Sequence, residues 1–153
     1  MKQKGVMVVG WELALSATIP GEPVGKGRPR VCKTHVFTPA KTRDWAAYAV
    51  GIILAEAEHN QGPPIDSPCR VVIRAIASRP KNKRGKQWPD TLMHRTSRPD
   101  GDNVEKAVLD ALVTAGVLAD DRYVCRCSWA SLYAETTGAA RVEVSVWKER
   151  GER

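Results

Sequence analysis

Residues 98–121 read RPDGDNVEKAVLDALVTAGVLADD and combine a helical pattern with an unusual density of carboxylates. Between Asp100 and Asp121 this stretch holds six acidic residues and a single basic one, Lys106. The whole chain of 153 residues is basic, with 24 Lys and Arg against 17 Asp and Glu. Outside the stretch 23 basic residues face 11 acidic ones, so a protein suited to a polyanionic partner gathers its carboxylates in one place.

A helix is predicted inside this stretch, with Asp102 or Asn103 as its N-cap and Gly116 as its end. Asp102, Lys106 and Asp110 follow one another at four-residue intervals and therefore share one face of that helix. The apolar residues recur at helical spacing on a different face. They are Val104, Ala107, Val108, Ala111 and Leu112.

The rest of the chain predicts an α/β (α+β) domain, with a small mixed β-sheet and two main helices. The expected order is β-(loop/hairpin)-α-β-loop-α-β-β. The strands are expected at 11–20, 69–78, 120–135 and 139–149, a short hairpin at 31–37, and a helix at 41–58 in which Trp45, Tyr48, Ile52 and Ala55 or Glu56 form one stripe. One domain spans residues 1–153, with 1–10 and 79–98 as candidate flexible segments.

The composition indicates which class of partner the protein binds and in which compartment it is expected. A pI near 9.5 points to nucleic acid, with an anionic membrane surface as the competitor. No run of 18 apolar residues and no signal-peptide pattern is present in the sequence, so no membrane span and an intracellular location are expected. The four cysteines form no C-x-x-C pair, and Cys125 and Cys127 are expected to be small buried residues of one strand.

The acidic residues allow two interpretations. Taken singly, Asp100-Gly101 is a turn, Glu105 lies in a first helical turn, and Asp120-Asp121 is a solvated turn. Taken together, they form a metal site if the chain brings Asp121 back toward Asp102, which the sequence leaves open. Carboxylate oxygens favour Mg²⁺ or Mn²⁺ over zinc, and the spacing excludes an EF-hand calcium loop.

These residues resemble the signature of the RusA-like Holliday junction resolvases. In RPDGDNVEKAVLDAL…GVLADD, the pattern Asp-x-Asp-Asn-x-x-Lys-x-x-x-Asp opens a helix and an Asp-Asp pair follows. The segments IPGEPVGKGRPRV and FTPAKTRDW are similar to the family's first strand and basic loop, and the matches bracket residues 13–125. Members are small α/β endonucleases, often encoded by phages or prophages, that act as homodimers and use Mg²⁺ to nick four-way DNA junctions symmetrically.

The resemblance implies roles for individual residues. Asp100, Asp102 and Asp121 would be the metal-binding catalytic carboxylates, with Asp120 as an auxiliary metal ligand. Lys106 would be the catalytic-site lysine. It would hold the scissile phosphate, stabilise developing charge or lower the pKa of its acidic neighbours, and the sequence does not choose among these roles. The long segment 79–98 and residues 1–10 depart from the compact members of the family.

Two basic loops supply the expected DNA contacts, for which a merely solvated surface is the alternative. The residues are Lys26, Arg28, Arg30, Arg43, Lys83, Arg84, Lys86 and Arg98. Trp88, inside the second basic loop, would either stack on an unpaired base or anchor that loop. The other tryptophans, Trp11, Trp45, Trp129 and Trp147, are expected in the core.

The sequence therefore predicts a Mg²⁺-dependent endodeoxyribonuclease, with Mn²⁺ as a substitute, that resolves four-way (Holliday) junctions by paired symmetric nicks in recombination and repair. Paired nicks on a two-fold junction imply a homodimer, with branched DNA as partner and neither a membrane nor a small-molecule cofactor. The expected location is the cytoplasm of a bacterium or of a phage-infected or prophage-carrying host. The alternatives are a branched-DNA or flap nuclease of the same chemistry and a non-catalytic basic DNA-binding protein.

Overall fold

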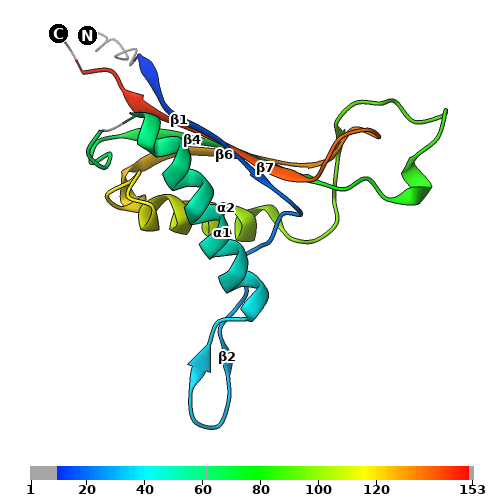
Figure 1. Ribbon diagram of the computed structural model, residues 1–153, viewed down its shortest axis with the longest axis horizontal. Helices are drawn as coiled ribbons and strands as arrows, with labels where there is room; N and C mark the ends of the chain where they lie inside the picture. The colour runs from blue at the N-terminus through cyan, green and yellow to red at the C-terminus, as the bar shows by residue number, and fades with distance from the viewer. Residues whose placement is uncertain (1–9, 61, 152–153) are drawn as a thin grey trace, which may run out of the picture.

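The protein is described by a computed structural model that covers residues 10–60 and 62–151. Within these residues, a five-stranded mixed sheet is covered on one face by two helices (Figure 1). The main elements are β1 (Trp11–Pro20), α1 (Ala40–Ala57), β4 (Cys69–Ala77), α2 (Gly101–Thr114), β6 (Val124–Tyr133) and β7 (Arg141–Glu149). The predicted class and element order are confirmed. Residues 1–9 of the candidate flexible segment 1–10 lie outside the described residues.

The strand order explains where the long middle segment runs. The strands lie in the order β1-β7-β4-β6-β5, where β5 is the two-residue strand Met93–His94. All neighbours are antiparallel except β4 and β6, which run parallel. Parallel neighbours need a crossover connection, so after β4 the chain leaves the sheet, adds the short edge strand β5, and then reaches β6 through α2.

The core lies between the sheet and the two helices. The buried residues of α2 are the five predicted from periodicity, Val104, Ala107, Val108, Ala111 and Leu112. In α1 the predicted stripe is partly wrong: the buried residues are Trp45, Ala49 and Ile53, and Tyr48 is exposed. None of the described helices is long and apolar enough to cross a membrane.

The start of β6 differs from the prediction. Residues Asp121–Tyr123 form a 3₁₀ turn, and the strand begins only at Val124. The pairing of β6 with β4 shifts by one residue between Val124 and Arg126, so Cys125 is the extra residue of a β-bulge. Cys125 is consequently exposed rather than buried, whereas Cys127 is partly buried against the core.

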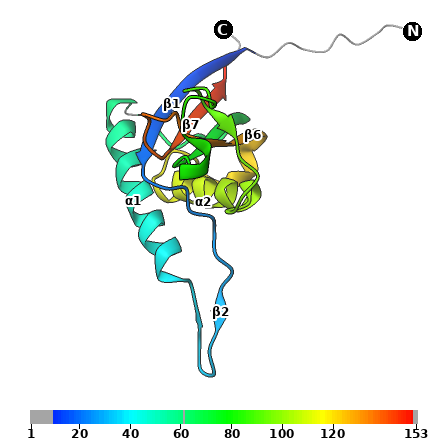
Figure 2. The same ribbon diagram turned by 90° about the vertical axis from the view of Figure 1, so that its right-hand side faces the viewer.

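Two segments extend from the compact body. The predicted hairpin is confirmed as β2 (Arg30–Val31) and β3 (Val36–Phe37), and it projects away from the sheet beyond the start of α1 (Figures 1 and 2). The segment 79–98 forms a long excursion on another side of the molecule (Figure 1). It contains the 3₁₀ turn Lys81–Lys83 and β5, and the start of α2 lies where this excursion ends.

Candidate active site

A hollow of about 320 Å³ at the start of α2 brings together three of the four predicted catalytic residues. Asp100, Asp102 and Lys106 line it from α2, and Lys26 and Arg28 line it from the segment that leads into the hairpin. We refer to it as the acidic hollow. Its lining combines carboxylates with cations, which is the chemistry needed to hold a metal ion beside a phosphate.

Asp100 also borders two adjacent hollows. One, of about 530 Å³, is lined by Arg30, Lys41 and Arg98 among others. The other, of about 380 Å³, is lined by Arg95, Trp129 and Ser131 together with Asp100 and Asp102. The predicted DNA contacts Lys26, Arg28, Arg30 and Arg98 therefore gather around the same carboxylate.

The helix start leaves the two carboxylates available to a ligand. The helix begins at Gly101, so Asp100 occupies the N-cap position that the sequence assigned to Asp102 or Asn103. Its carboxylate makes no capping hydrogen bond, and its backbone carbonyl accepts from the amides of Asn103 and Val104 instead. Asp102 lies in the first turn, where the helix dipole favours a negative charge. Lys106, one turn later, approaches it with 3.6 Å between Nζ and Oδ2.

The basic segment is fixed to α2 by its backbone. The amide of Lys26 donates to the carbonyl of Asn103 at 2.9 Å. Gly25 lies so close to the same helix that an added Cβ would stand 3.0 Å from Asn103 Cβ. The Lys26 ammonium pairs with Asp110 at 2.6 Å rather than with Asp100 or Asp102. The backbone of this basic segment is therefore held against the start of α2 before any ligand binds.

Asp120 and Asp121 lie elsewhere on the molecule. Asp121 lies in the 3₁₀ turn before β6, whereas Trp129, beside the acidic hollow, lies five residues into that strand, about 16 Å beyond its first residue Val124. Asp120 caps the 3₁₀ turn, with its Oδ1 accepting from the Arg122 amide at 2.9 Å. Among the described residues, no group of three His, Cys, Asp or Glu side chains is close enough to hold a metal ion. Within one chain, Asp100 and Asp102 thus lie together at the acidic hollow, and Asp121 lies outside it.

The carboxylates at the acidic hollow fit a hard divalent cation. Mg²⁺ is commonly held by one or two carboxylates, with waters and substrate phosphate completing its shell. Asp100 and Asp102 supply such a pair, and their neighbours Lys106 and Arg28 supply charge for a phosphate. Oxygen donors of this kind suit Mg²⁺ or Mn²⁺ better than zinc.

Two residues beside the hollow were not singled out from the sequence. Trp129, expected in the core, is 47% exposed and lines the hollow beside Asp100 and Asp102. Arg95 was only one of many basic residues in its loop, yet it is 7% exposed and its Nη1 donates to the Arg98 carbonyl at 2.7 Å. Its Nε and Nη2 are buried without a partner among the described residues. The only sequence signal for the tryptophan was Gly101, a residue small enough for a ring to lie on the helix start.

The remaining predicted DNA contacts stand apart from these hollows. Lys83 lies over the ring of Tyr133, with its Nζ 4.9 Å from the centroid. Arg84 donates through Nε to the Arg79 carbonyl at 3.0 Å, and Lys86 is exposed. Arg43 is exposed on α1. These four side chains line none of the three hollows around Asp100.

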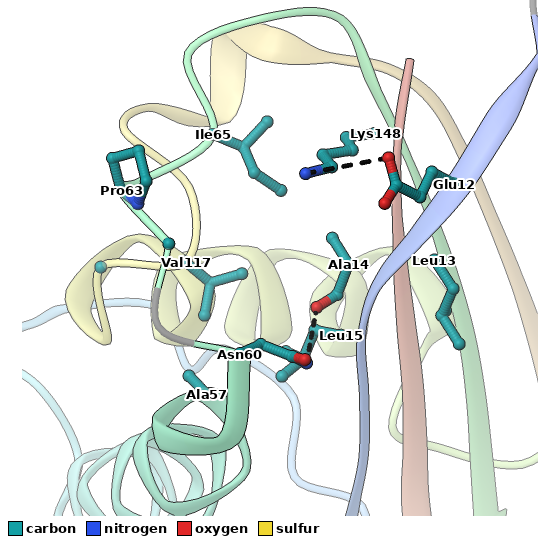
Figure 3. Close-up of a pocket in the computed structure, with 12 residues that line it drawn as sticks. Glu12, Leu13, Ala14, Leu15, Ala57, Asn60, Pro63, Ile65, Val117 and Lys148 are labelled. Carbon is teal, nitrogen blue, oxygen red and sulfur yellow. Dashed lines mark hydrogen bonds and ion pairs between the residues drawn. The ribbon is translucent and has the colours of Figure 1, made fainter. Parts of the chain in front are cut away.

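A fourth hollow, of about 280 Å³, lies away from the acidic one, beside β1 and the end of α1 (Figure 3). Its polar groups contact one another: Asn60 Nδ2 donates to the Ala14 carbonyl at 3.0 Å, and Lys148 pairs with Glu12 at 3.9 Å. No predicted site residue lines it. It therefore has no part in the candidate active site.

The chain is similar to a known family and to a known bacterial protein. The family model described as Endodeoxyribonuclease RusA matches residues 20–146, which include both the basic segment and the acidic stretch. A protein of Bacillus subtilis (strain 168), named only as uncharacterized protein YqaN, is 30% identical over 138 residues. That alignment covers 84% of this chain and 92% of the relative.

Proposed function

We propose, because the chain belongs to the RusA endodeoxyribonuclease family, that it is a metal-dependent nuclease that resolves four-way DNA junctions by paired nicks. The observation that carries the proposal is the acidic hollow, where Asp100, Asp102 and Lys106 meet Lys26 and Arg28. This arrangement supplies metal ligands and phosphate contacts from two segments that lie more than 70 residues apart in the chain. We further propose that the enzyme acts in recombination and repair of bacterial or phage DNA, in the cytoplasm.

The proposed chemistry divides among the residues of the hollow. Bound Mg²⁺, or Mn²⁺ in its place, would activate a water and neutralise charge on the phosphate. Asp100 and Asp102 are the residues that would hold it. Lys106 is placed one helical turn from Asp102, where its ammonium can contact a phosphate oxygen and stabilise the developing negative charge. Arg28 can fix a second oxygen of the DNA backbone, because a guanidinium matches phosphate geometry.

A homodimer is the second part of the proposal, and the separation of the acidic residues supports it. On one side, β6 is paired with β4. On its other side, strand pairing within the described residues begins only at Leu132, so residues 124–130 leave an open edge. If two copies paired antiparallel along this edge, a two-fold axis near residues 125–127 would set residue 121 of one copy opposite residues 129–133 of the other. Asp121 of the partner subunit would then approach Asp100 and Asp102.

The test of the catalytic claim is cleavage of a labelled synthetic four-way junction, in Mg²⁺ and in EDTA, beside a linear duplex. We expect metal-dependent symmetric nicks on the junction, abolished in Asp102→Asn while binding persists. The matched control is Asp66→Asn, an equal change of charge at an exposed position outside the hollow. Tight binding without cleavage by the unmodified protein in Mg²⁺ or Mn²⁺ would instead favour a DNA-binding protein.

The dimeric site has a separate test. Asp102→Asn and Asp121→Asn are purified singly, shown to be inactive, and then mixed under conditions that allow subunit exchange. In a shared site, each mixed dimer has one site with both substitutions and one intact site, so single-strand nicking returns. If each site belongs to one chain, the mixture stays inactive. Sedimentation of the unmodified protein gives the subunit number independently.

The alternative nuclease function differs from the proposed one in its DNA substrate. A flap or other branched-DNA nuclease would use the same carboxylates, because the hydrolytic chemistry is unchanged. Comparing rates on four-way junctions, flaps and forks separates the two. Faster cleavage of a flap than of a junction, with one nick per molecule, would favour the alternative.

A further inference from the structure

We propose that the β2–β3 hairpin is a wedge that enters the centre of branched DNA, where its apolar side chains pack against unstacked bases. This inference rests on the proposed function for the identity of the substrate, a branched DNA. The hairpin extends beyond the body of the molecule, past the start of α1 (Figure 2). The hairpin can therefore contact a part of the DNA that lies away from the acidic hollow.

The hairpin carries apolar surface that the fold does not bury. Val31 is 80% exposed, Val36 is 63% exposed and Phe37 is 42% exposed. Val31 and Val36 are direct cross-strand partners, so they form one apolar patch on one face of the hairpin. Such a patch on a projecting element has no role in the core and is suited to an apolar partner.

The charge around the patch identifies that partner. From residue 23 to residue 43 the sequence contains six basic residues and no acidic one. The six are Lys26, Arg28, Arg30, Lys33, Lys41 and Arg43. An apolar patch inside a uniformly basic segment disfavours a second copy of this chain, because the two basic segments would repel each other. It matches DNA, which presents phosphates around the faces of its bases.

The hairpin is tied to the catalytic end of the molecule. The Gly27 amide donates to Thr42 Oγ1 at 3.2 Å, which closes the base of the hairpin against α1. The Lys26 amide donates to the Asn103 carbonyl, which joins the same base to the start of α2. At the tip, the Cys32 amide donates to the His35 carbonyl at 2.9 Å. The apolar patch is thus held in a defined relation to Asp100 and Asp102.

Apolar side chains that enter DNA separate neighbouring bases and kink the helix. A four-way junction lowers the cost of this step, because strands exchange at its branch point and the base pairs there open more readily than those inside a duplex. Val31 and Val36 would contact the exposed base faces, whereas Phe37, the next residue in β3, faces the other side of the hairpin with Arg30. The basic side chains around them would contact the flanking phosphates.

The test measures base stacking directly and needs no cleavage. A four-way junction carries 2-aminopurine either at the branch point or within an arm, and the protein carries Asp102→Asn so that the DNA stays intact. We expect fluorescence to rise on binding at the branch point only. Val31→Ser/Val36→Ser should lose most of that rise and bind the junction about tenfold more weakly, with duplex binding changed much less.

Two matched variants separate the wedge from other causes. Val31→Ile/Val36→Ile keeps the patch apolar and should keep the fluorescence rise. Leu13→Ser removes an exposed apolar side chain, 48% exposed on β1, and should behave as the parent. An unchanged rise in Val31→Ser/Val36→Ser would overturn the proposal, and so would an equal loss of affinity for junction and duplex. Conversion of a dimer to a monomer by the serine pair would identify the hairpin as an interface between copies.

The result of the fluorescence test can be interpreted separately from the test of DNA cleavage. Loss of the branch-point signal in the serine pair would support the wedge even if the unmodified protein cleaved no DNA. Normal cleavage of four-way junctions by the serine pair, with an undiminished signal, would leave the nuclease in place and remove the wedge.

Discussion

The indole ring of Trp129 lies directly against the backbone of Gly101, the residue between Asp100 and Asp102. A Cβ atom added at Gly101 would overlap three carbons of that ring, so alanine does not fit unless the helix start or the ring moves. The spacing of the Asp100 and Asp102 carboxylates therefore depends on the absence of a side chain at Gly101.

Gly101→Ala should lower junction cleavage by at least about tenfold, because a shift of the helix start moves both carboxylates. Overpacking should also reduce the free energy of unfolding by about 1–3 kcal/mol. The control is Gly51→Ala in α1, where an added Cβ meets nothing within 4 Å and the gain in helix propensity is up to about 1 kcal/mol. Cleavage rates and urea unfolding measure both; full activity in Gly101→Ala would contradict the role of this contact.

Asp110→Asn should tighten DNA binding with little effect on folding. The Lys26–Asp110 pair is about half exposed on both sides and contributes at most about 1 kcal/mol to stability. Without Asp110, the Lys26 ammonium becomes available to a phosphate. The slope of log affinity against log salt should then steepen by about 0.9. Asp66→Asn makes the same change of charge at a distance, and an equal effect there would show that only net charge matters.

The cysteines should differ in reactivity. Cys32 is exposed, and its pKa is lowered, chiefly by a hydrogen bond from the Thr34 backbone. Burial raises the pKa of Cys69 to about 11 and that of Cys127 to about 12. Iodoacetamide at neutral pH should therefore modify Cys32 well before Cys69 or Cys127, as peptide mass spectrometry can measure. Equal rates in the folded protein would contradict the burial of the latter two.

The same raised thiol pKa values predict a loss of stability in alkali. Cys69 and Cys127 hold their protons above the ordinary thiol pKa of 9.0 only in the folded state. Their contribution is thus fully present below pH 9 and is lost as the pH rises toward 11 and 12. Urea unfolding at pH 8 and pH 10.5 measures the difference. A Cys69→Ala/Cys127→Ala variant should show a smaller decline.

Arg79→Met should destabilise the protein and loosen the segment 79–98. Arg79 is 2% exposed, and its guanidinium donates to the carbonyls of Pro89, Thr91 and Ala134. Leaving these carbonyls without a donor should cost about 2–4 kcal/mol. Limited proteolysis within 79–98 should become faster. Lys86→Met, an exposed change in the same segment, is the control and should leave both measurements unchanged.

The spacing of apolar residues predicted the buried face of α2 correctly and that of α1 only in part. In α2, charged residues alternate with apolar ones and mark the solvent side, so all five buried residues were identified. In α1, every residue from 45 to 55 is apolar or glycine. Without polar residues to mark the exposed side, the sequence could not fix which way the helix faces, and Tyr48 was placed on the wrong side.

One part of the candidate site could be predicted from local sequence, and the other part depends on tertiary structure. Asp100, Asp102 and Lys106 lie within two helical turns, so the helix alone brings them together. The position of Asp121 depends on how far β6 runs beside α2, and no local pattern encodes that length. Trp129 was placed in the core because a tryptophan in a strand is usually buried. Its partly exposed position against Gly101 depends on how β6 and the start of α2 meet in the folded chain.

The attachment of the segment 79–98 has a consequence for how such proteins diversify. The segment lies inside the crossover from β4 to β6, and the hydrogen bonds of Arg79 tie its root to the end of β6. The outer part of the segment can therefore vary in length and charge, whereas β5 and Arg95 near its end are fixed by their pairing with β6. Under the proposed function, changes in this outer part, between Lys81 and Trp88, would alter contacts with DNA without moving Asp100 and Asp102.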